Sequence, residues 1–333
     1  MELLKQETEE IVSVKLPVGS VLQWLNAYLV RGEDGYTLLD AGMPDEETFG
    51  LWQQAWRHLG ISPRDITSII ITHHHVDHYG LAARLQEVTG ASVRMTESCF
   101  LQASRIWSAD SVYDEEVLEL FARHGAPRHL LEVTAPELKH YVKSVNVHPD
   151  AEFIRAGDKL ALGKSIYEAE LVSGHAEGHL CLYDKQEQLV FCGDHVIPKM
   201  LPNLNFTLGF DENPLGSYFS SLKEHAELPV RKAYPGHMIP FRKYNARAAD
   251  IAAQYRQRID DILARMDKPM TAFELCCLVF FVPINAEQLR FKLFEMLACL
   301  NYLQSLNLIK PAEAGADGRL YYRRAPVHAN QNP

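Results

Sequence analysis

The feature that most constrains this 333-residue chain is a run of histidines and one aspartate directly after an apolar segment. Residues 66–71 read Ile-Thr-Ser-Ile-Ile-Ile, which is typical of a buried central strand. The chain then continues Thr-His-His-His-Val-Asp-His over residues 72–78. In α/β domains, ligand sites usually form where such strands end. The sequence therefore predicts a binding site at the end of this strand.

The spacing within this segment indicates a metal site. Side chains two residues apart in an extended loop leave the backbone on the same side, so His73 and His75 can share one metal ion. Asp77 and His78 add an oxygen and a nitrogen ligand a little further along the chain. His74, which lies between the first two, is expected to face away from the metal.

The pattern His-x-His-x-Asp-His over residues 73–78 resembles the signature of the metallo-β-lactamase superfamily. Three other features of that family have counterparts in the same order: a Gly-His segment, an aspartate that ends an apolar strand, and a Pro-Gly-His turn. They occur here at His175, Asp194 and His237. The resemblance extends over residues 10–240.

This resemblance implies two metal ions that share one carboxylate. The implied ligands are His73, His75 and His175 for one ion, Asp77, His78 and His237 for the other, and Asp194 as the bridge, with Asp77 and Asp194 as the catalytic carboxylates. Three protein ligands for each ion, plus a share of the bridge, leave a position open for water, as in catalytic rather than structural sites. We expect zinc, with iron or manganese as alternatives because mixed nitrogen and oxygen ligation suits all three metals.

The resemblance also implies a reaction. Members of the superfamily use a metal-bound hydroxide, and the chain looks like the branch of glyoxalase II-like hydrolases and the lactamase-β-like protein 2 group. We expect it to cleave an ester-type bond in a thioester, a lactone or a related acyl substrate. The alternative is a metal-dependent endoribonuclease or phosphodiesterase, since the fold does not choose the substrate. A third hypothesis, a metal-free binding module, is disfavoured by the complete set of seven ligands.

The order of predicted elements indicates a layered α/β fold. By resemblance, residues 1–245 are expected to form a four-layer αββα metallo-β-lactamase sandwich, with a helical insert at about 97–145. This insert either packs on the core or forms a lid that shapes an apolar pocket. Residues 246–333 are predicted to form a linker helix and a winged-helix-like domain, whose hairpin turns at Gly-Ala-Asp-Gly over 315–318.

Several neighbours of the expected ligands are further candidates. Asp40 either orients a ligating histidine or caps a glycine turn, and His179 and His195 are expected to support the ligands without binding metal. Three residues are candidates for contacting substrate: Tyr79, Lys199 and Asn203. The remaining seven histidines are predicted to be solvated surface residues, namely His58, His124, His129, His140, His148, His225 and His328.

The charge distribution bears on the partner. The chain has 33 basic and 43 acidic residues; of its net charge of -10, residues 1–247 carry about -11 and the remainder about +1. This disfavours a nucleic acid and favours a small acyl substrate, although Arg319, Arg323 and Arg324 leave RNA as an alternative. The apolar face of the helix predicted at 286–306 is expected to pack on the catalytic domain or, in a homodimer, on a second subunit.

The start of the chain, Met-Glu-Leu-Leu-Lys-Gln-Glu-Thr-Glu-Glu, lacks the apolar segment of a secretory signal. No apolar run approaches the roughly 18 residues that are needed to span a bilayer. The six cysteines have no Cys-x-x-Cys spacing and are interpreted as reduced thiols. We therefore expect a cytoplasmic protein with no membrane partner.

Overall fold

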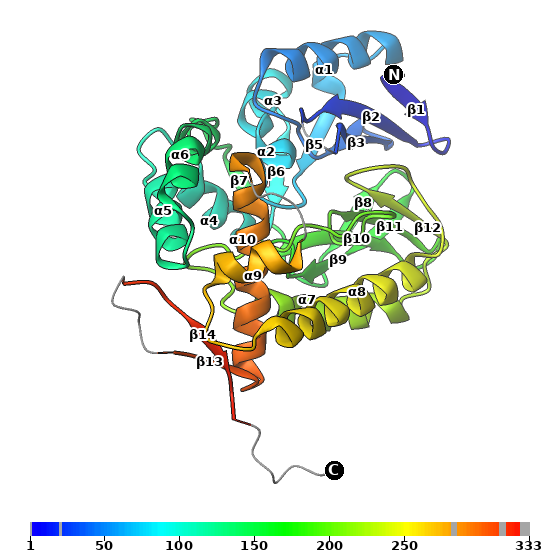
Figure 1. Cartoon of the computed structure of the whole chain (residues 1–333). Helices are drawn as coiled ribbons and strands as arrows, with labels where there is room; N and C mark the ends of the chain where they lie inside the picture. Colours follow the sequence, from blue (N-terminus) through cyan, green and yellow to red (C-terminus); the bar gives the residue numbers. More distant parts are fainter. Residues whose placement is uncertain (1, 20–21, 281–284, 313–317, 327–333) are drawn as a thin grey trace.

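The computed structural model describes residues 2–19, 22–280, 285–312 and 318–326. Two β-sheets lie face to face, and helices cover their outer faces (Figure 1). The first sheet follows the order of the sequence: β1 (Leu4–Gln6), β2 (Ile11–Pro17), β3 (Trp24–Arg31), β4 (Tyr36–Leu39), β5 (Ile66–Ile70), β6 (Ser92–Met95) and β7 (Ala151–Phe153). The second has the order β12 (Lys232–Pro235), β11 (Leu189–Gly193), β10 (His179–Asp184), β9 (Ser165–Val172) and β8 (Lys159–Leu162).

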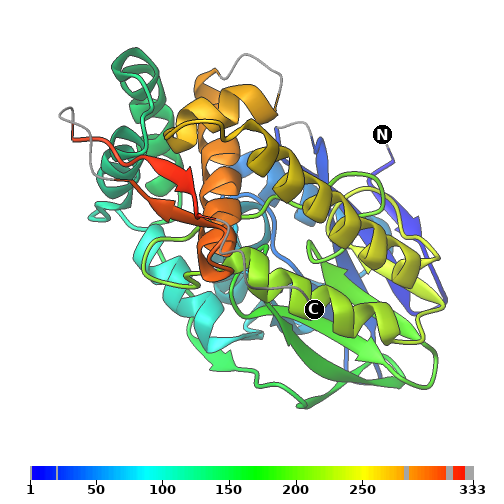
Figure 2. The same ribbon diagram turned by 60° about the horizontal axis from the view of Figure 1, so that its bottom comes forward.

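The helices form the two outer layers and a group at one side of the sheets (Figures 1 and 2). Their bounds are α1 (Glu46–Leu59), α2 (Val76–Tyr79), α3 (Ala82–Thr89), α4 (Glu97–Ile106), α5 (Tyr113–Arg123), α6 (Arg128–Val142), α7 (Pro214–Glu227), α8 (Tyr244–Arg265), α9 (Ala272–Val279) and α10 (Ala286–Ser305), with a short 3₁₀ turn at Pro63–Asp65. A two-stranded sheet of β13 (Ile309–Pro311) and β14 (Tyr322–Arg324) follows.

The layers follow from which faces are apolar. Between the sheets, the Tyr28 ring meets Phe191 at 5.2 Å and Tyr234 at 5.7 Å between centroids, so both sheets contribute to one inner core. On the outer face of the first sheet, Trp52 and Trp56 of α1 are buried. Helices α7 and α8 cover the outer face of the second sheet (Figure 2). The chain thus has the predicted α/β sandwich.

Two local signals in the sequence explain where helices begin. Asp45 precedes α1, and its carboxylate accepts a hydrogen bond from the Thr48 amide at 2.7 Å. At α9, Thr271 and Glu274 form the reciprocal capping box that the sequence predicts, with N–H···O distances of 3.2 and 2.8 Å. Both helices therefore begin where a side chain satisfies the free backbone amides.

The predicted helical insert consists of α4, α5 and α6, between β6 and β7. Of the two interpretations, its aromatic residues favour packing on the core, because Trp107, Tyr113 and Phe121 are buried. Phe121 meets Phe294 of α10 at 5.0 Å between ring centroids.

The C-terminal helices pack on the catalytic part. Helix α8 lies along α7, and α10 contacts both α6 and α7. Leu297 and Leu300 of α10 are buried in a core cluster that also contains Val12 of β2, so the core is continuous across residue 245. The domain division at 245 and the winged-helix assignment stay predictions. Of the predicted hairpin turn, residues 315–317 lie outside the described residues.

Because the core is continuous, we expect the C-terminal helices and the catalytic part to unfold together. Leu300→Ala should lower the free energy of unfolding by about 2–5 kcal/mol, because it removes a fully buried side chain. All four tryptophans lie in the first 107 residues, so their fluorescence reports unfolding of the catalytic part. We expect the denaturation midpoint measured by this fluorescence to fall.

The matched control is Leu306→Ala at the end of the same helix, where the leucine is 47% exposed and the change should stay within about 0.5 kcal/mol. An unchanged tryptophan midpoint in Leu300→Ala, with a second transition by circular dichroism, would show instead that the C-terminal segment unfolds separately.

Candidate metal centre

Strand ends from both sheets meet at one place. Parallel strands bring their carboxyl ends to the same edge, and β4 and β5 are parallel, as are β11 and β12. Five strand ends supply the predicted residues: Asp40 follows β4, residues 72–78 follow β5, His175 follows β9, Asp194 follows β11 and His237 follows β12. The fold therefore brings together side chains that are up to about two hundred positions apart in sequence.

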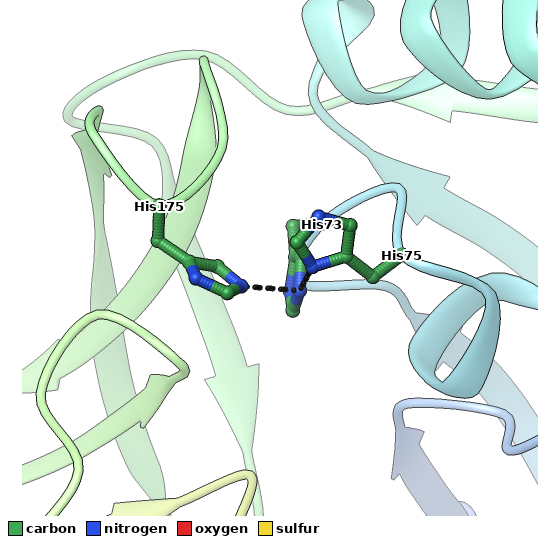
Figure 3. A group of neighbouring side chains, drawn as sticks. All are labelled: His73, His75 and His175. Atoms are coloured by element: carbon green, nitrogen blue, oxygen red, sulfur yellow. Dashed lines mark hydrogen bonds between the residues drawn. The ribbon is translucent and has the colours of Figure 1, made fainter. Parts of the chain in front are cut away.

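The first group of predicted ligands converges through ring nitrogens. His73 Nε2 lies 3.0 Å from His75 Nδ1 and 3.2 Å from His175 Nε2 (Figure 3). Burial lowers the pKa of all three imidazoles, so the neutral forms are favoured. Neutral imidazole is the form that binds metal. These three nitrogens can therefore hold one cation.

The second group combines a carboxylate with two histidines. Asp77 Oδ2 lies 3.2 Å from His237 Nε2 and 3.8 Å from His78 Nε2. Asp194 lies between the two groups: its Oδ2 is 3.2 Å from His237 Nε2 and 3.6 Å from His175 Nε2. Its other oxygen, Oδ1, is 3.6 Å from His78 Nε2. Asp194 is therefore the one carboxylate of the predicted set that reaches both groups.

Interactions between charged groups determine the direction of the pKa shifts in the second group. Burial alone would raise the pKa of Asp194, but His237 and His78 hold it well below its ordinary value. Burial opposes the protonation of His237, yet Asp194 and Asp77 raise its pKa to about 10. For His78, the carboxylates of Asp40, Asp194 and Asp77 likewise outweigh burial and raise the pKa. Protons thus balance the carboxylates here, and a bound cation would replace them.

The unsatisfied atoms of this group fit a metal ion. Among the described residues, His78 Nε2, His237 Nε2 and Asp194 Oδ1 are buried and make no hydrogen bond. Leaving such atoms unpaired costs free energy, which a cation shared between them would recover. Glycine at 236 is needed for this closeness, because a Cβ there would lie 2.6 Å from Asp194 Oδ1 and 2.7 Å from His78 Cε1. The donor set therefore suits two divalent cations.

In three of the predicted histidine ligands, the ring nitrogen that faces away from the ligand group makes a hydrogen bond to the protein. His78 Nδ1 lies 2.8 Å from Asp40 Oδ2, which is the contact that an orienting role for Asp40 requires. Backbone carbonyls serve two more: His175 Nδ1 donates to Asn203 O at 2.7 Å and His237 Nδ1 to Trp24 O at 2.9 Å. The Asn203 contact thus involves its backbone rather than its side chain.

Asn205 contacts the predicted ligand His75, and the sequence analysis did not single it out. Its side-chain amide lies 2.8 Å from His75 Nε2. The atom at this distance is the amide nitrogen Nδ2, so Asn205 donates to His75 Nε2 and holds the orientation of the His75 ring. The only signal in sequence is the position of Asn205 on the loop after Asp194.

The remaining candidates lie outside the ligand groups. His179 Nε2 accepts from the Asp194 amide at 3.1 Å, and His195 is buried 4.6 Å from the His225 ring. The Tyr79 hydroxyl bonds to His148 Nδ1 at 2.8 Å rather than pointing to the ligands. Lys199 is exposed. The structure therefore brings together the seven predicted ligands and Asp40, but not Tyr79 or Lys199.

Three histidines that were expected at the surface are not there. His124 and His225 are buried and His148 is half-buried, so the expectation was wrong for them. His225 bonds to the Tyr244 hydroxyl at 2.7 Å and the His124 ring stacks on Tyr322. These partners are distant in sequence, which is why the burial was not foreseen. His58, His129 and His140 are exposed, and His328 lies outside the described residues.

A small pocket adjoins the first group of ligands. It begins at Gly174, next to His175, and at Asn205, which contacts His75. Its lining is mostly polar and consists of Gln102, Gly174, Glu177, Asn205, Thr207, Phe210, Asp211 and Pro214. The pocket therefore lies beside the first group of predicted ligands.

Comparison with known sequences agrees with this geometry. The family described as the metallo-beta-lactamase superfamily matches residues 25–237, a range that contains all seven predicted ligands. The chain belongs to this superfamily. Family, fold and ligand set together identify it as a metallo-β-lactamase-fold hydrolase.

Individual members of the superfamily are similar over most of their length. The Bacillus subtilis protein named "Probable metallo-hydrolase YqjP" is 26% identical over 82% of this chain and 86% of its own. "Acyl-coenzyme A thioesterase MBLAC2" of Gallus gallus is 25% identical over 68% of this chain and 80% of its own. The crystal structure of a metallo-beta-lactamase family protein from Thermus thermophilus is 28% identical, with a TM-score of 0.83, over 96% of this chain and 100% of its own.

As a metallo-β-lactamase superfamily member, the chain should lose metal when Gly236 is replaced. In Gly236→Ala the new methyl group would displace Asp194 or His78, so we expect the metal content after dialysis to fall from about two ions per chain to one or fewer. Mass spectrometry of metals in the purified protein measures this.

Gly50→Ala on α1 is the control, because a Cβ there meets no atom within 4 Å. Metal content equal to that of the unaltered protein in Gly236→Ala, with normal thermal stability, would contradict the proposed placement of the second ion.

Proposed function

We propose that this chain is a binuclear metal-dependent hydrolase that cleaves an ester-type acyl bond, with a thioester as the first candidate. The observation that carries the proposal is the position of Asp194. One of its oxygens lies 3.2 Å from His237 Nε2 and 3.6 Å from His175 Nε2, so the same carboxylate reaches a ligand of each group. This arrangement supports two ions that share one carboxylate.

Zinc is the proposed metal, because three nitrogen ligands in the first group and mixed ligands in the second suit it. When bound, two such ions would lower the pKa of water and polarise the scissile carbonyl group. The protein's own contribution is to orient the histidine rings. Asp40, the Asn203 carbonyl and the Trp24 carbonyl each hold a histidine Nδ1–H, which directs the Nε2 lone pair toward the metal.

Charge supports an acyl substrate over a phosphodiester. Residues 1–247 carry a net charge of about -11, which would repel a nucleic acid. Arg324, one of the three arginines that left RNA as an alternative, donates to the Leu263 carbonyl at 2.8 Å. One relative is named as an acyl-coenzyme A thioesterase, which supports a thioester in particular.

A panel of substrates tests the proposal. The purified chain, supplied with Zn²⁺ or Mn²⁺, should hydrolyse thioesters or lactones. Removal of metal by a chelator should abolish turnover, and added Zn²⁺ should restore it. Turnover of single-stranded RNA alone would reject the acyl assignment in favour of a phosphodiesterase.

Asp77→Ala tests the second metal position. This variant should lose activity by about 10³-fold or more, since it removes the carboxylate beside His237. Its melting temperature should stay within a few degrees of the unaltered value. Asp260→Ala on the exposed side of α8 is the matched control and should keep full activity. Full activity in Asp77→Ala would rule out a hydrolytic site that uses this group.

A further inference from the structure

The small pocket beside the first group of predicted ligands is lined by the helical insert, by the loop between β9 and β10, and by the loop that leads to α7. Gly174 in its lining directly precedes His175. Asn205, also in the lining, has its amide nitrogen 2.8 Å from His75 Nε2. A substrate whose scissile bond lies at these histidines can therefore place the atoms next to that bond in the pocket.

Gln102 of α4 brings a buried hydrogen-bond acceptor to the lining of this pocket. Its Nε2 donates to the Glu177 carbonyl at 2.8 Å and to the Ser98 carbonyl at 3.0 Å. These carbonyls fix the orientation of the amide, because an oxygen in place of Nε2 would face other oxygens. The acceptor Oε1 is buried and makes no hydrogen bond within the described part of the chain. Leaving it unpaired costs free energy, which a hydrogen-bond donor bound in the pocket would recover.

Two carboxylates line the same pocket and have only neutral partners. The Glu177 carboxylate accepts a hydrogen bond from Ser98 Oγ at 3.2 Å, and the Asp211 carboxylate accepts one from the Asn213 amide at 2.9 Å. All 33 lysines and arginines lie among the described residues, and none of them forms an ion pair with either carboxylate. Because both carboxylates are only partly exposed, their attraction for a cation is less screened than on the open surface.

The rest of the lining suits an organic cation. Phe210 and Pro214 supply apolar side chains and Thr207 supplies a hydroxyl group. The two carboxylates do not belong to the groups of side chains that could hold a metal ion among the described residues. An ammonium group carries one positive charge and three N–H donors, so it can pair with the carboxylates and with an amide oxygen. The negative charge of residues 1–247 also attracts a small cation at long range.

We propose that this pocket binds a protonated amino group of the substrate through Glu177, Asp211 and Gln102, while the ester-type bond lies at the predicted metal ligands. The inference rests on the proposed function and narrows it to aminoacyl esters or thioesters whose amino group is a few bonds from the scissile carbonyl. The three residues determine specificity and take no part in bond cleavage.

Kinetics with paired thioesters of one thiol test the inference. Glycyl and propanoyl thioesters differ only in an ammonium or a methyl group, and β-alanyl and butanoyl thioesters differ in the same way one carbon further from the bond. At pH 7 the amino groups are mostly protonated, since the ordinary pKa of an α-amino group is about 7.7–8.0. In one pair, kcat/KM corrected for spontaneous hydrolysis should be about 10- to 100-fold higher for the amino member, mainly through KM. No preference for the amino member in either pair would overturn the inference.

Three variants locate the preference. Glu177→Gln and Asp211→Asn each remove one charge but keep an oxygen for the Ser98 hydroxyl or the Asn213 amide. Each should lower the ratio of kcat/KM between the amino and methyl members by about tenfold. Glu212→Gln is the matched control, because Glu212 adjoins Asp211 but is exposed and outside the lining, and it should keep the unaltered ratio. An equal fall in Glu212→Gln would assign the preference to the overall charge of the chain and overturn the pocket.

Binding measurements distinguish this inference from the proposed function. Calorimetry with uncleavable ketone analogues, in which a methylene group replaces the sulfur atom, needs no turnover. Tighter binding of the amino than of the methyl analogue, reduced in Glu177→Gln, supports the ammonium site even if no thioester is hydrolysed. Equal binding of the two analogues by the unaltered protein overturns the site even if thioesters are hydrolysed. A hydroxyl analogue that binds as tightly as the amino analogue would overturn the assignment to a cation.

Discussion

The Asp194 carboxylate is buried among histidine nitrogens, and this costly arrangement is the constraint on which the rest of the molecule depends. Groups of this kind come out of water only when charges are balanced and every remaining polar atom is paired. The chain meets this demand by ending strands of both sheets at one place, so that no ligand lies on a long free loop. The nearby backbone leaves no spare room, as the 2.6 Å from a hypothetical Cβ at Gly236 to Asp194 illustrates. The strands therefore hold the carboxylates and histidine rings close together, although these polar groups would be more stable apart in water.

The C-terminal helix α8 is part of this support. Arg247 donates to the carbonyls of Ile197 and Met200 at 2.7 and 2.6 Å, and the Tyr255 hydroxyl donates to that of Pro202 at 2.9 Å. These bonds hold the loop after Asp194, whose Asn203 carbonyl in turn accepts from His175. Catalytic ligands are thus linked to residues beyond 245 through backbone carbonyls. This linkage gives a physical reason why the buried core continues across the predicted domain boundary.

Sequence reasoning succeeded where the signal is local, as in the strand before residue 72 and the α9 capping box. The sandwich followed from the family resemblance, and the metal-binding role of the ligand motif stays a prediction. Sequence reasoning failed where a contact joins distant segments through groups without a residue signature. The contacts at Asn203 and Trp24 are made by backbone carbonyl groups, which every residue has. No sequence pattern therefore predicts these contacts. His124 and His225 were misplaced at the surface for a similar reason, because their partners Tyr322 and Tyr244 come from other elements.

Electrostatics then connects the fold with the choice of substrate. An acidic chain repels polyanions at long range, but this effect is screened over about 10 Å at ordinary salt and does not decide contacts at short range. Contacts inside the candidate site are less screened, because buried charges such as those of Asp194 and His237 interact in a less polar medium than water. The net charge therefore acts on the approach of a partner, whereas the buried groups act on the bond that lies beside them. Long-range repulsion thus disfavours a polyanion, and the choice among small acyl substrates depends on contacts at short range.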